Sequence, residues 1–365
     1  MLGNTGIGRY LRNLLLELAT LDRQNEYVLF MQPNTPPPVE QENFIAAYLP
    51  AYTPIYSLAE QYRLPLEIYK RRVALMHYPN FNLPLFPCCP YVVTIHDLIY
   101  YLYPDECPSR FAHYYACFMI ARAVKHAKAV MTVSEYSKRD LMRYFHLSAE
   151  KIRVIPNGAD ELCFPREGEN AKIAASFRDR FRERLGILNR YVLYVGKHHL
   201  YKNIATLIRA FMTHPAVYEQ TQLVIAGTRD PRRKELYELA ERSDPGGRII
   251  FTNFMSDDGL FELYRGASLF VFPSLYEGFG LPPLEAMACG APVICSNAAS
   301  LPEVVGDAAI LVNPTNAREM ADAMRNVLTD STLSQSLQAK GRAQAQRFSW
   351  ERAARQLLDV YTQAV

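Results

Sequence analysis

Hydrophobic residues in the second half of the chain fall into short continuous runs. The runs at residues 191–195, 223–226 and 269–272 are rich in β-branched and aromatic side chains. Runs of this length indicate strands that are buried on both faces. Segments with helical periodicity lie between and after them, near residues 203–213, 232–242, 256–266 and 282–289. Strands that alternate with helices in this way predict a parallel sheet and a Rossmann-like α/β domain.

The first half of the chain repeats this alternation less clearly. Its candidate strands lie at residues 27–31, 73–78, 91–95, 129–133 and 153–155. Its first helix is clear, because the apolar side chains at positions 7, 10, 11, 14, 15 and 18 form one stripe. The proline-rich stretch 33–38 and the segment 79–90 predict loops. We therefore expect a second Rossmann-like domain in this half.

A charged stretch without a long apolar run, residues 166–184, separates the two alternating blocks. A chain of 365 residues is long enough for two hydrophobic cores. We expect an N-terminal domain at residues 1–165 and a C-terminal domain at 166–346. The last of three further helices, near 347–365, is expected to cross back to the first domain, because it carries an apolar stripe that needs a partner.

The beginning of the chain departs from the usual pattern of such a domain. A doubly wound domain opens with a buried strand that leads into a Gly-rich turn, but here Met1 stands five residues before Gly6. We therefore expect the first strand of the N-terminal domain to be missing. Two explanations stay open: the chain is a truncated version of a longer protein, or another strand fills the gap and covers the neighbouring backbone groups.

Composition narrows the possible functions and locations. The net charge of +3 is too small for a nucleic-acid binder that works by neutralising phosphates. The seven cysteines show neither CxxC pairs nor zinc-ligand spacing, which favours a reducing cytoplasm. No apolar run approaches the roughly 20 residues that span a bilayer, and no signal peptide is present. We expect a cytoplasmic protein with, at most, peripheral contact at the inner face of the membrane.

Two kinds of segment are candidates for such a membrane contact. The aromatic segment 111–119 is an acceptor platform, a membrane-facing patch or part of the core. The basic clusters at 69–72 and at Lys138, Arg139 and Arg143 would meet anionic lipid or form solvated helix faces. The sequence does not decide between these interpretations.

The strongest chemical signal is the segment 273–290, which follows a buried strand and opens a helix. Gly278 and Gly280 permit close backbone approach to a ligand, and a helix that starts near Pro282 offers unpaired N–H groups to a diphosphate. Glu277 lies before this helix and Glu285 in its first turn, so they should contact different ligand parts. Glu285 suits a ribose and Glu277 a sugar ring. The alternative is a glycine-containing loop that binds no ligand, with a glutamate near the helix N-terminus that the helix dipole stabilises. The loop follows the carboxyl end of a strand, however, and this is where open α/β sheets bind ligands.

On these residues, the stretch 191–314 resembles the donor-binding domain of glycosyltransferase family 4, whose fold is called GT-B. The similarity includes Gly196 with the following Lys202 and Asn203, and the segments 224–227, 270–274 and 290–294. In the first half, segments 6–10, 94–97, 132–134 and 155–158 are similar to the same family. The resemblance covers nearly the whole chain. It implies an α/β protein of two Rossmann-like domains whose parallel sheets face each other across a cleft.

The resemblance also implies an activity and a set of donor-binding residues. The activity is retaining transfer of a hexose from a nucleotide diphosphate sugar to a glycan or lipid-linked acceptor. The resemblance places Glu277 at the transferred sugar, Glu285 at the ribose, and the N–H groups of Phe279, Gly280 and Leu281 at the sugar and phosphates. Lys202 would neutralise the departing diphosphate in place of a metal ion, so no metal or cofactor is expected. The alternative for Lys202 is a solvated surface charge.

The resemblance also implies other donor-side residues. Many relatives carry an arginine beside the lysine, and here Lys197 would substitute for it without bidentate geometry. His198 and His199 are ordinary loop histidines in this interpretation. Gly227 ends a strand and is expected to lie at the donor, and backbone groups around Phe254 are expected to select the base.

The acceptor side is expected to include His96, Gly6, Gly8 and Arg9. His96 follows the strand at 91–95 and would donate a hydrogen bond near the transferred sugar, or form a capping or packing pair with Asp97. The two glycines and Arg9 are expected to form the loop that enters the first helix.

The Gly-Ile-Gly-Arg-Tyr form of the first loop is similar to bacterial mannosyltransferases of polysaccharide assembly, so GDP-mannose is the first expectation for the donor, ahead of a UDP sugar. A nucleotide-sugar epimerase on the same architecture and a non-catalytic nucleotide-sugar-binding protein are the alternatives. An NAD-dependent dehydrogenase is disfavoured, because no G-x-G-x-x-G follows a strand.

Overall fold

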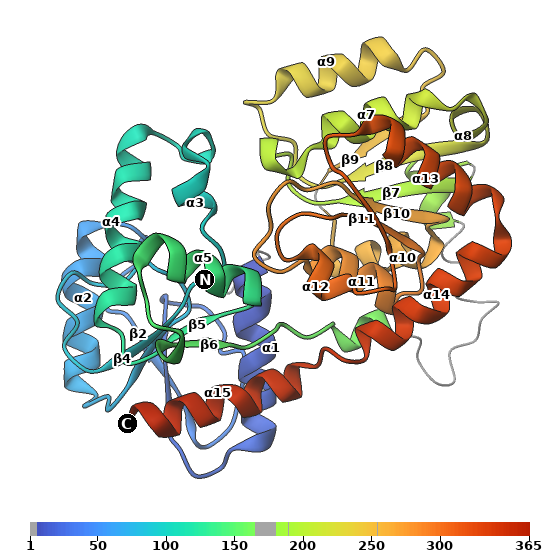
Figure 1. Cartoon of the computed structure of the whole chain (residues 1–365). Helices are drawn as coiled ribbons and strands as arrows, with labels where there is room; N and C mark the ends of the chain where they lie inside the picture. Colours follow the sequence, from blue (N-terminus) through green and yellow to red (C-terminus); the bar gives the residue numbers. More distant parts are fainter. Residues whose placement is uncertain (1–5, 165–179, 189, 254) are drawn as a thin grey trace. The chain divides into compact units, whose positions relative to one another are not determined.

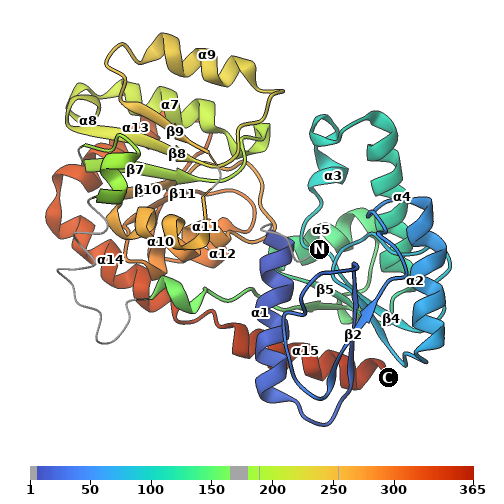
Figure 2. The same ribbon diagram turned by 180° about the vertical axis from the view of Figure 1, so that it is seen from behind.

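The computed structural model (Figures 1 and 2) describes residues 6–164, 180–188, 190–253 and 255–365. The chain forms two compact units, one made of Met1–Gly158 with Ser349–Val365 and the other of Ala159–Phe348. It therefore passes from one unit to the other twice. The first passage lies before the expected junction at 165/166, because the 3₁₀ turn η3 (Glu161–Cys163) packs against the second unit, where Arg265 donates a hydrogen bond to the Leu162 carbonyl.

Six parallel strands form the sheet of the second unit in the order β12-β11-β10-β7-β8-β9. They are β7 (Arg190–Val195), β8 (Thr221–Ala226), β9 (Ile249–Thr252), β10 (Leu269–Phe272), β11 (Val293–Ser296) and β12 (Ile310–Val312). The chain runs outward from β7 to β9 and then returns to the other side of β7 with β10. The point where the strand order reverses, between β7 and β10, is where open α/β sheets bind ligands.

Helices cover both faces of this sheet (Figure 1). On one face lie α7 (Ile204–Thr213), α8 (Pro215–Gln220), α9 (Lys234–Ser243) and α13 (Ala317–Thr329); on the other lie α10 (Asp257–Gly266), α11 (Leu281–Ala288), α12 (Leu301–Val305) and α14 (Ser331–Ala345). The double cover explains why the central strands are apolar throughout, and the expected β-α alternation is confirmed. The sequence interpretation omitted the short elements α8, α12, β9, β11 and β12, each of six residues or fewer.

The parallel strands of the first unit fall into two groups. Four form the order β3-β4-β5-β6 and two form the pair β1-β2. They are β1 (Tyr27–Met31), β2 (Phe44–Tyr48), β3 (Met76–Tyr78), β4 (Tyr91–Thr94), β5 (Val130–Thr132) and β6 (Ile152–Val154). Around them lie α1 (Gly6–Leu21), α2 (Leu58–Lys70), α3 (Ile99–Leu102), α4 (Arg110–His126), α5 (Glu135–Phe145) and α15 (Trp350–Ala364), with the 3₁₀ turns η1 (Pro104–Glu106) and η2 (Ala149–Lys151). Among these helices the sequence interpretation located α1 and α15 alone, and it omitted β2.

The break between the two groups falls where the first strand of a doubly wound sheet would stand. In that arrangement strand 1 lies between strands 2 and 4. Here β1 and β2 follow α1 as strands 2 and 3 would, and β3 begins the other group as strand 4 would. Within the described residues, which start at Gly6, no strand precedes α1 and none pairs β1 with β3. Because residues 1–5 lie outside the described residues, the missing first strand stays a prediction.

The last helix, α15, packs on α1 and belongs to the first unit. The Trp350 ring lies 6.1 Å from the Tyr10 ring, and the Tyr361 hydroxyl lies 2.6 Å from Nδ1 of His77 in β3. Nε2 of that histidine lies 2.8 Å from the Thr94 hydroxyl. Burial lowers the pKa of His77 to about 3, so the ring is neutral at pH 7. The helix is therefore held by a polar network as well as by its apolar face.

Candidate functional site

The reversal of strand order in the second unit brings the turn after β7 against the loop after β10. The turn contains the 3₁₀ segment η4 (Leu200–Lys202) and Asn203, whose φ of 59° is one that asparagine tolerates. The Asn203 amide donates to the carbonyls of Pro273 (3.1 Å) and Pro314 (2.7 Å). The Leu275 N–H donates to the Tyr201 carbonyl at 2.7 Å. These bonds fix Lys202 beside the segment that carries Glu277.

Lys202 and Glu277 form a nearly buried ion pair. Lys202 Nζ lies 2.6 Å from Glu277 Oε1, and the two side chains are only 12% and 11% exposed. The ammonium also lies 5.2 Å from the ring centroids of Tyr201 and Phe272, within range of a cation–π interaction. Each charge offsets the cost of burying the other. Loss of either side chain would leave the other charge buried and unpaired. The sequence named both residues but did not anticipate this contact.

The loop after β10 is shaped by a glycine and by a serine from another segment. Gly280 has φ of 124°, and a Cβ there would lie 2.8 Å from the Leu301 side chain. Ser300 is fully buried, and its hydroxyl shares its one hydrogen between the carbonyls of Glu277 (2.9 Å) and Phe279 (2.7 Å). Helix α11 then begins at Leu281, with proline in its first turn. The first N–H groups of this helix have no intrahelical partner, which makes its N-terminus suited to an anion.

We predict that Ser300→Ala lowers kcat/KM about 10-fold and the free energy of unfolding by about 1–2 kcal/mol, because two carbonyls of the loop lose their donor. Initial rates and urea unfolding would measure the two effects. Asp330→Ala, which removes the N-cap of α14, is the matched control: it should cost about 1 kcal/mol of stability and leave the rate unchanged. Equal rates for Ser300→Ala and the control would refute the positioning role of Ser300.

Glu285 lies deeper than expected. It is the fifth residue of α11, one turn past the start, and so does not lie in the first turn as the sequence suggested. Its side chain is almost fully buried, and Oε2 accepts a hydrogen bond from the Tyr264 hydroxyl at 3.2 Å. Tyr264 comes from α10 and no local sequence signal pairs it with Glu285. The contact orients the carboxylate.

Two glycines at the ends of neighbouring strands allow close backbone packing. The Gly196 N–H donates to the Ala226 carbonyl at 2.9 Å, and a Cβ on Gly227 would lie 2.0 Å from the Gly196 oxygen. Side chains are therefore excluded at the carboxyl ends of β7 and β8. Lys197 is exposed, while Phe254 lies outside the described residues.

His198 packs inside the second unit. It is almost fully buried, its Nδ1 lies 2.9 Å from the Tyr237 hydroxyl, and burial lowers its pKa to about 4. Among the described residues, no group of three or more potential metal-ligating side chains is present.

The predicted acceptor-side residues lie in the first unit. His96 follows β4, and its Nε2 lies 3.0 Å from the Pro79 carbonyl, so Nε2 must carry the proton. Burial lowers the pKa of His96 to about 4, which keeps the ring neutral and leaves Nδ1 as a hydrogen-bond acceptor. This differs from the expected donor role. Asp97 caps the following turn, because Oδ1 accepts from the Ile99 N–H at 2.9 Å.

Gly6, Gly8 and Arg9 do not form a loop. All three lie in the first turns of α1, which begins at Gly6, so the sequence interpretation was wrong here. The apolar spacing that predicts the helix already starts at Ile7, and Gly8 and Tyr10 are buried on the core side.

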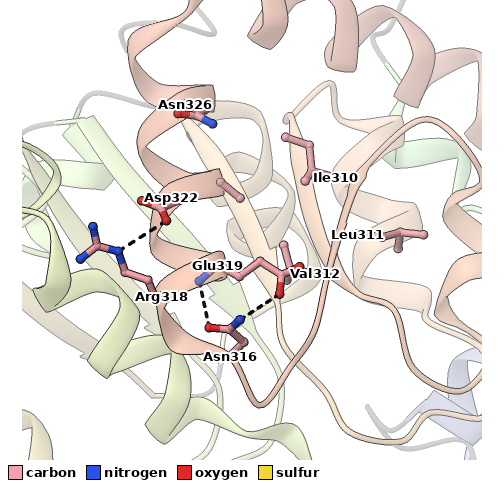
Figure 3. Close-up of a pocket in the computed structure, with 9 residues that line it drawn as sticks. Ile310, Leu311, Val312, Asn316, Arg318, Glu319, Asp322 and Asn326 are labelled. Atoms are coloured by element: carbon pink, nitrogen blue, oxygen red, sulfur yellow. Dashed lines mark hydrogen bonds and ion pairs between the residues drawn. The ribbon is translucent and has the colours of Figure 1, made fainter.

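A separate pocket lies between β12 and α13, at the edge of the sheet in the second unit (Figure 3). It is lined by Ile310, Leu311, Val312, Asn316, Arg318, Glu319, Asp322, Ala323 and Asn326. Arg318 and Asp322 form an ion pair of 3.5 Å across one turn of α13. None of the residues predicted for the site lines this pocket.

Comparison with known proteins identifies the family. A model described as Glycosyltransferase Family 4 matches residues 4–161, and one described as Glycosyl transferases group 1 matches residues 177–344. The chain is 31% identical over 373 residues to O-antigen chain mannosyltransferase B of Escherichia coli, covering 98% of this chain and 96% of that protein. The chain belongs to glycosyltransferase family 4. It is thus a glycosyltransferase, as the sequence motifs led us to expect.

Other similar proteins show how far the likeness extends. Serotype-specific mannosyltransferase WbdA of Escherichia coli is 34% identical over 239 residues, which are 65% of this chain but only 29% of that longer protein. Sucrose-phosphate synthase from Thermosynechococcus elongatus superposes with a TM-score of 0.77 at 25% identity, over 98% of this chain and 93% of that one. WaaG, a glycosyltransferase involved in lipopolysaccharide biosynthesis, has a TM-score of 0.71 at 19% identity, over 98% and 96% of the two chains. The GT-B fold is confirmed.

Proposed function

We propose that this glycosyltransferase transfers mannose from GDP-mannose, with retention of configuration, to a glycan or lipid-linked acceptor. The observation that carries the proposal is the Lys202–Glu277 pair at the carboxyl ends of β7 and β10. A cation and a carboxylate at this point suit the two halves of a nucleotide sugar, the diphosphate and the hexose hydroxyls. The choice of mannose is supported by relatives named as mannosyltransferases.

The donor-binding proposal gives each group one task. Lys202 and the N–H groups of Phe279, Gly280 and Leu281 face the diphosphate, and Glu277 faces the hydroxyls of the transferred sugar. Glu285 binds the ribose and must then accept from the ribose as well as from Tyr264. Donor binding replaces the contact between Lys202 and Glu277 with one contact to phosphate and one to sugar, so neither charge is left unpaired.

The other predicted donor residues have supporting tasks. Gly196 and Gly227 let the nucleotide approach the backbone, and Lys197 adds positive charge near the phosphates. Backbone groups around Phe254 select the base.

In the proposed reaction the acceptor hydroxyl attacks the anomeric carbon from the same face that the diphosphate leaves, while the bond to the diphosphate oxygen breaks. That leaving oxygen takes the acceptor's proton, so no protein base is needed. Negative charge builds up on the diphosphate, and Lys202 with the N-terminus of α11 stabilises it. His96 accepts a hydrogen bond from a sugar hydroxyl through Nδ1 and orients the ring. Gly6, Gly8 and Arg9 contribute the start of α1 to the acceptor side.

The direct test is a panel of GDP and UDP sugars, screened first by thermal shift and then for transfer to glycan and lipid-linked acceptors. We expect the largest shift with GDP-mannose, and transfer only in the presence of an acceptor. Release of an isomerised sugar without acceptor would favour the epimerase alternative. Binding without turnover would favour the non-catalytic alternative.

We also predict that activity persists within about 2-fold in excess EDTA, because a lysine ammonium and a helix N-terminus supply the positive charge that a metal would supply elsewhere. Initial rates with and without chelator would test this, with a Mg²⁺-dependent transferase as positive control. Loss of activity that added Mg²⁺ restores would show that a metal shares the work of Lys202.

A further inference from the structure

Two helices of the first unit present apolar side chains to solvent. In α2 the exposed positions recur every three or four residues, so they form one stripe: Leu58, Tyr62, Leu66 and Tyr69. In α4 the corresponding stripe is Phe111, Tyr114 and Phe118, opposite the core face of Ala116, Met119, Ile120 and Ala123. Each of these seven outward side chains is more than half exposed. Neither stripe is therefore used by the core.

The segment between β3 and β4 joins the two stripes into one surface. The Leu85 N–H donates to the Gln61 side chain of α2 at 2.7 Å, and the Arg122 guanidinium of α4 donates to the Leu85 carbonyl. The same guanidinium lies 5.9 Å from the ring centroid of Phe86, which is 82% exposed. Helices α2 and α4 lie side by side in both views (Figures 1 and 2). We call the nine residues Leu58, Tyr62, Leu66, Tyr69, Leu85, Phe86, Phe111, Tyr114 and Phe118 the α2–α4 surface.

Positive charge is concentrated around this surface. Residues 58–72 and 110–126 contain seven Lys or Arg and two Glu, whereas the whole chain has a net charge of only +3. Lys70 pairs with Glu67 at 2.6 Å. Exposed Arg71 and Arg72 follow the end of α2, Arg110 starts α4, and exposed Lys125 lies in its last turn. The surface thus combines aromatic rings with an excess of basic side chains.

We propose that the α2–α4 surface docks on an anionic lipid bilayer. Aromatic and leucine side chains enter the headgroup region, and the basic side chains meet lipid phosphates. The charge favours this occupant over a second copy of the chain, since two copies of the same basic surface would repel each other. In the described residues no helix is long and apolar enough to cross a membrane, so the contact is peripheral. It rests on the surface itself and not on donor binding.

The other basic cluster suggested by the sequence lacks this combination. The guanidinium groups of Arg139 and Arg143 lie 5.5 and 5.4 Å from the rings of Tyr136 and Tyr144 in their own helix, α5. Neither tyrosine is among the exposed large apolar residues. Helix α5 therefore offers a matched control, with equally basic side chains and no aromatic stripe.

The test is co-sedimentation of the full chain with vesicles of phosphatidylcholine, with and without phosphatidylglycerol. We expect binding to the anionic vesicles only, weakened by salt. The apolar variant Leu66→Ser/Phe86→Ser/Phe118→Ser should lower the partition coefficient at least 10-fold. The basic variant Arg71→Gln/Arg72→Gln/Lys125→Gln should lower it by roughly fivefold per charge at low salt. The control Arg139→Gln/Arg143→Gln should stay within about 2-fold of the wild type.

Three results would overturn the proposal: no binding by the wild type, equal losses in the α5 control, or a wild-type dimer that the apolar variant converts to a monomer in light scattering. Circular dichroism checks that each variant is folded, and the basic variant tests the proposal even if the apolar one unfolds.

Thermal shift with GDP and transfer to a soluble acceptor should be unchanged in both variants. If the wild type bound vesicles normally but lacked these activities, that would instead count against the proposed function.

Discussion

Lys202→Ala is expected to lower kcat roughly 100-fold or more, as the loss of an aligned contact to a developing charge does. The ammonium lies at the reversal of strand order, held there by the turn that Asn203 ties to the loop after β10. Without it the departing diphosphate is stabilised by helix N–H groups alone, and Glu277 is left as a nearly buried, unpaired carboxylate. Steady-state rates with saturating donor would measure the effect.

The matched control for this substitution is Lys340→Ala. Lys340 also pairs with a carboxylate, that of Asp307 at 3.1 Å, but both side chains are at least half exposed. The control should keep the wild-type rate, because an exposed pair contributes little and lies outside the site. A Lys202→Ala enzyme with a near-normal rate would remove the lysine from the mechanism.

Glu277→Ala is expected to produce a loss of similar size, roughly 100-fold or more in kcat, for two reasons. The variant loses the carboxylate proposed to hold the sugar hydroxyls, and it releases Lys202 from its partner. Glu277→Gln keeps a hydrogen-bond acceptor but not the charge, so its rate should lie between those of Glu277→Ala and the wild type. Rates with saturating donor, and calorimetry with GDP alone, would separate the sugar contact from the diphosphate contact.

The double variant Lys202→Ala/Glu277→Ala gives a further check on the pair. Because the two residues contact each other, the losses in kcat should not be additive in free energy. The kcat of the double variant should be much higher than the value obtained by multiplying the two single reductions. Asp307→Ala is the control for removing a paired carboxylate at the surface. Fully additive losses, or an active Glu277→Ala enzyme, would contradict the shared role.

The sequence predicted most of the second unit because its local signals agree with its tertiary structure. The strand at 269–272, the glycine-containing loop and the helix near Pro282 were all expected, and helix α11 begins within about a residue of the expected start. Short continuous apolar runs indicate buried strands directly. The family motifs then named Lys202 and Glu277.

The contacts that position these residues could not be predicted, because they join segments far apart in the chain. Ser300 holds the carbonyl of Glu277 from 23 positions away, and Asn203 reaches Pro314 across 111. Nothing near a buried serine or asparagine in the sequence indicates which carbonyl it will meet. Helix α2 has a weak sequence signal for a different reason: it contains Pro65, and proline normally argues against a helix interior.

Helix α15 makes the second unit, in effect, an insertion within the first. The chain leaves the first unit after Gly158 and re-enters it at Ser349, and a Cβ on Gly158 would lie 2.3 Å from the Trp350 backbone nitrogen. The two crossings therefore run side by side. Recombination between relatives at one of these points alone would pair α15 of one parent with α1 of the other. Exchange of an intact second unit requires both breakpoints at once.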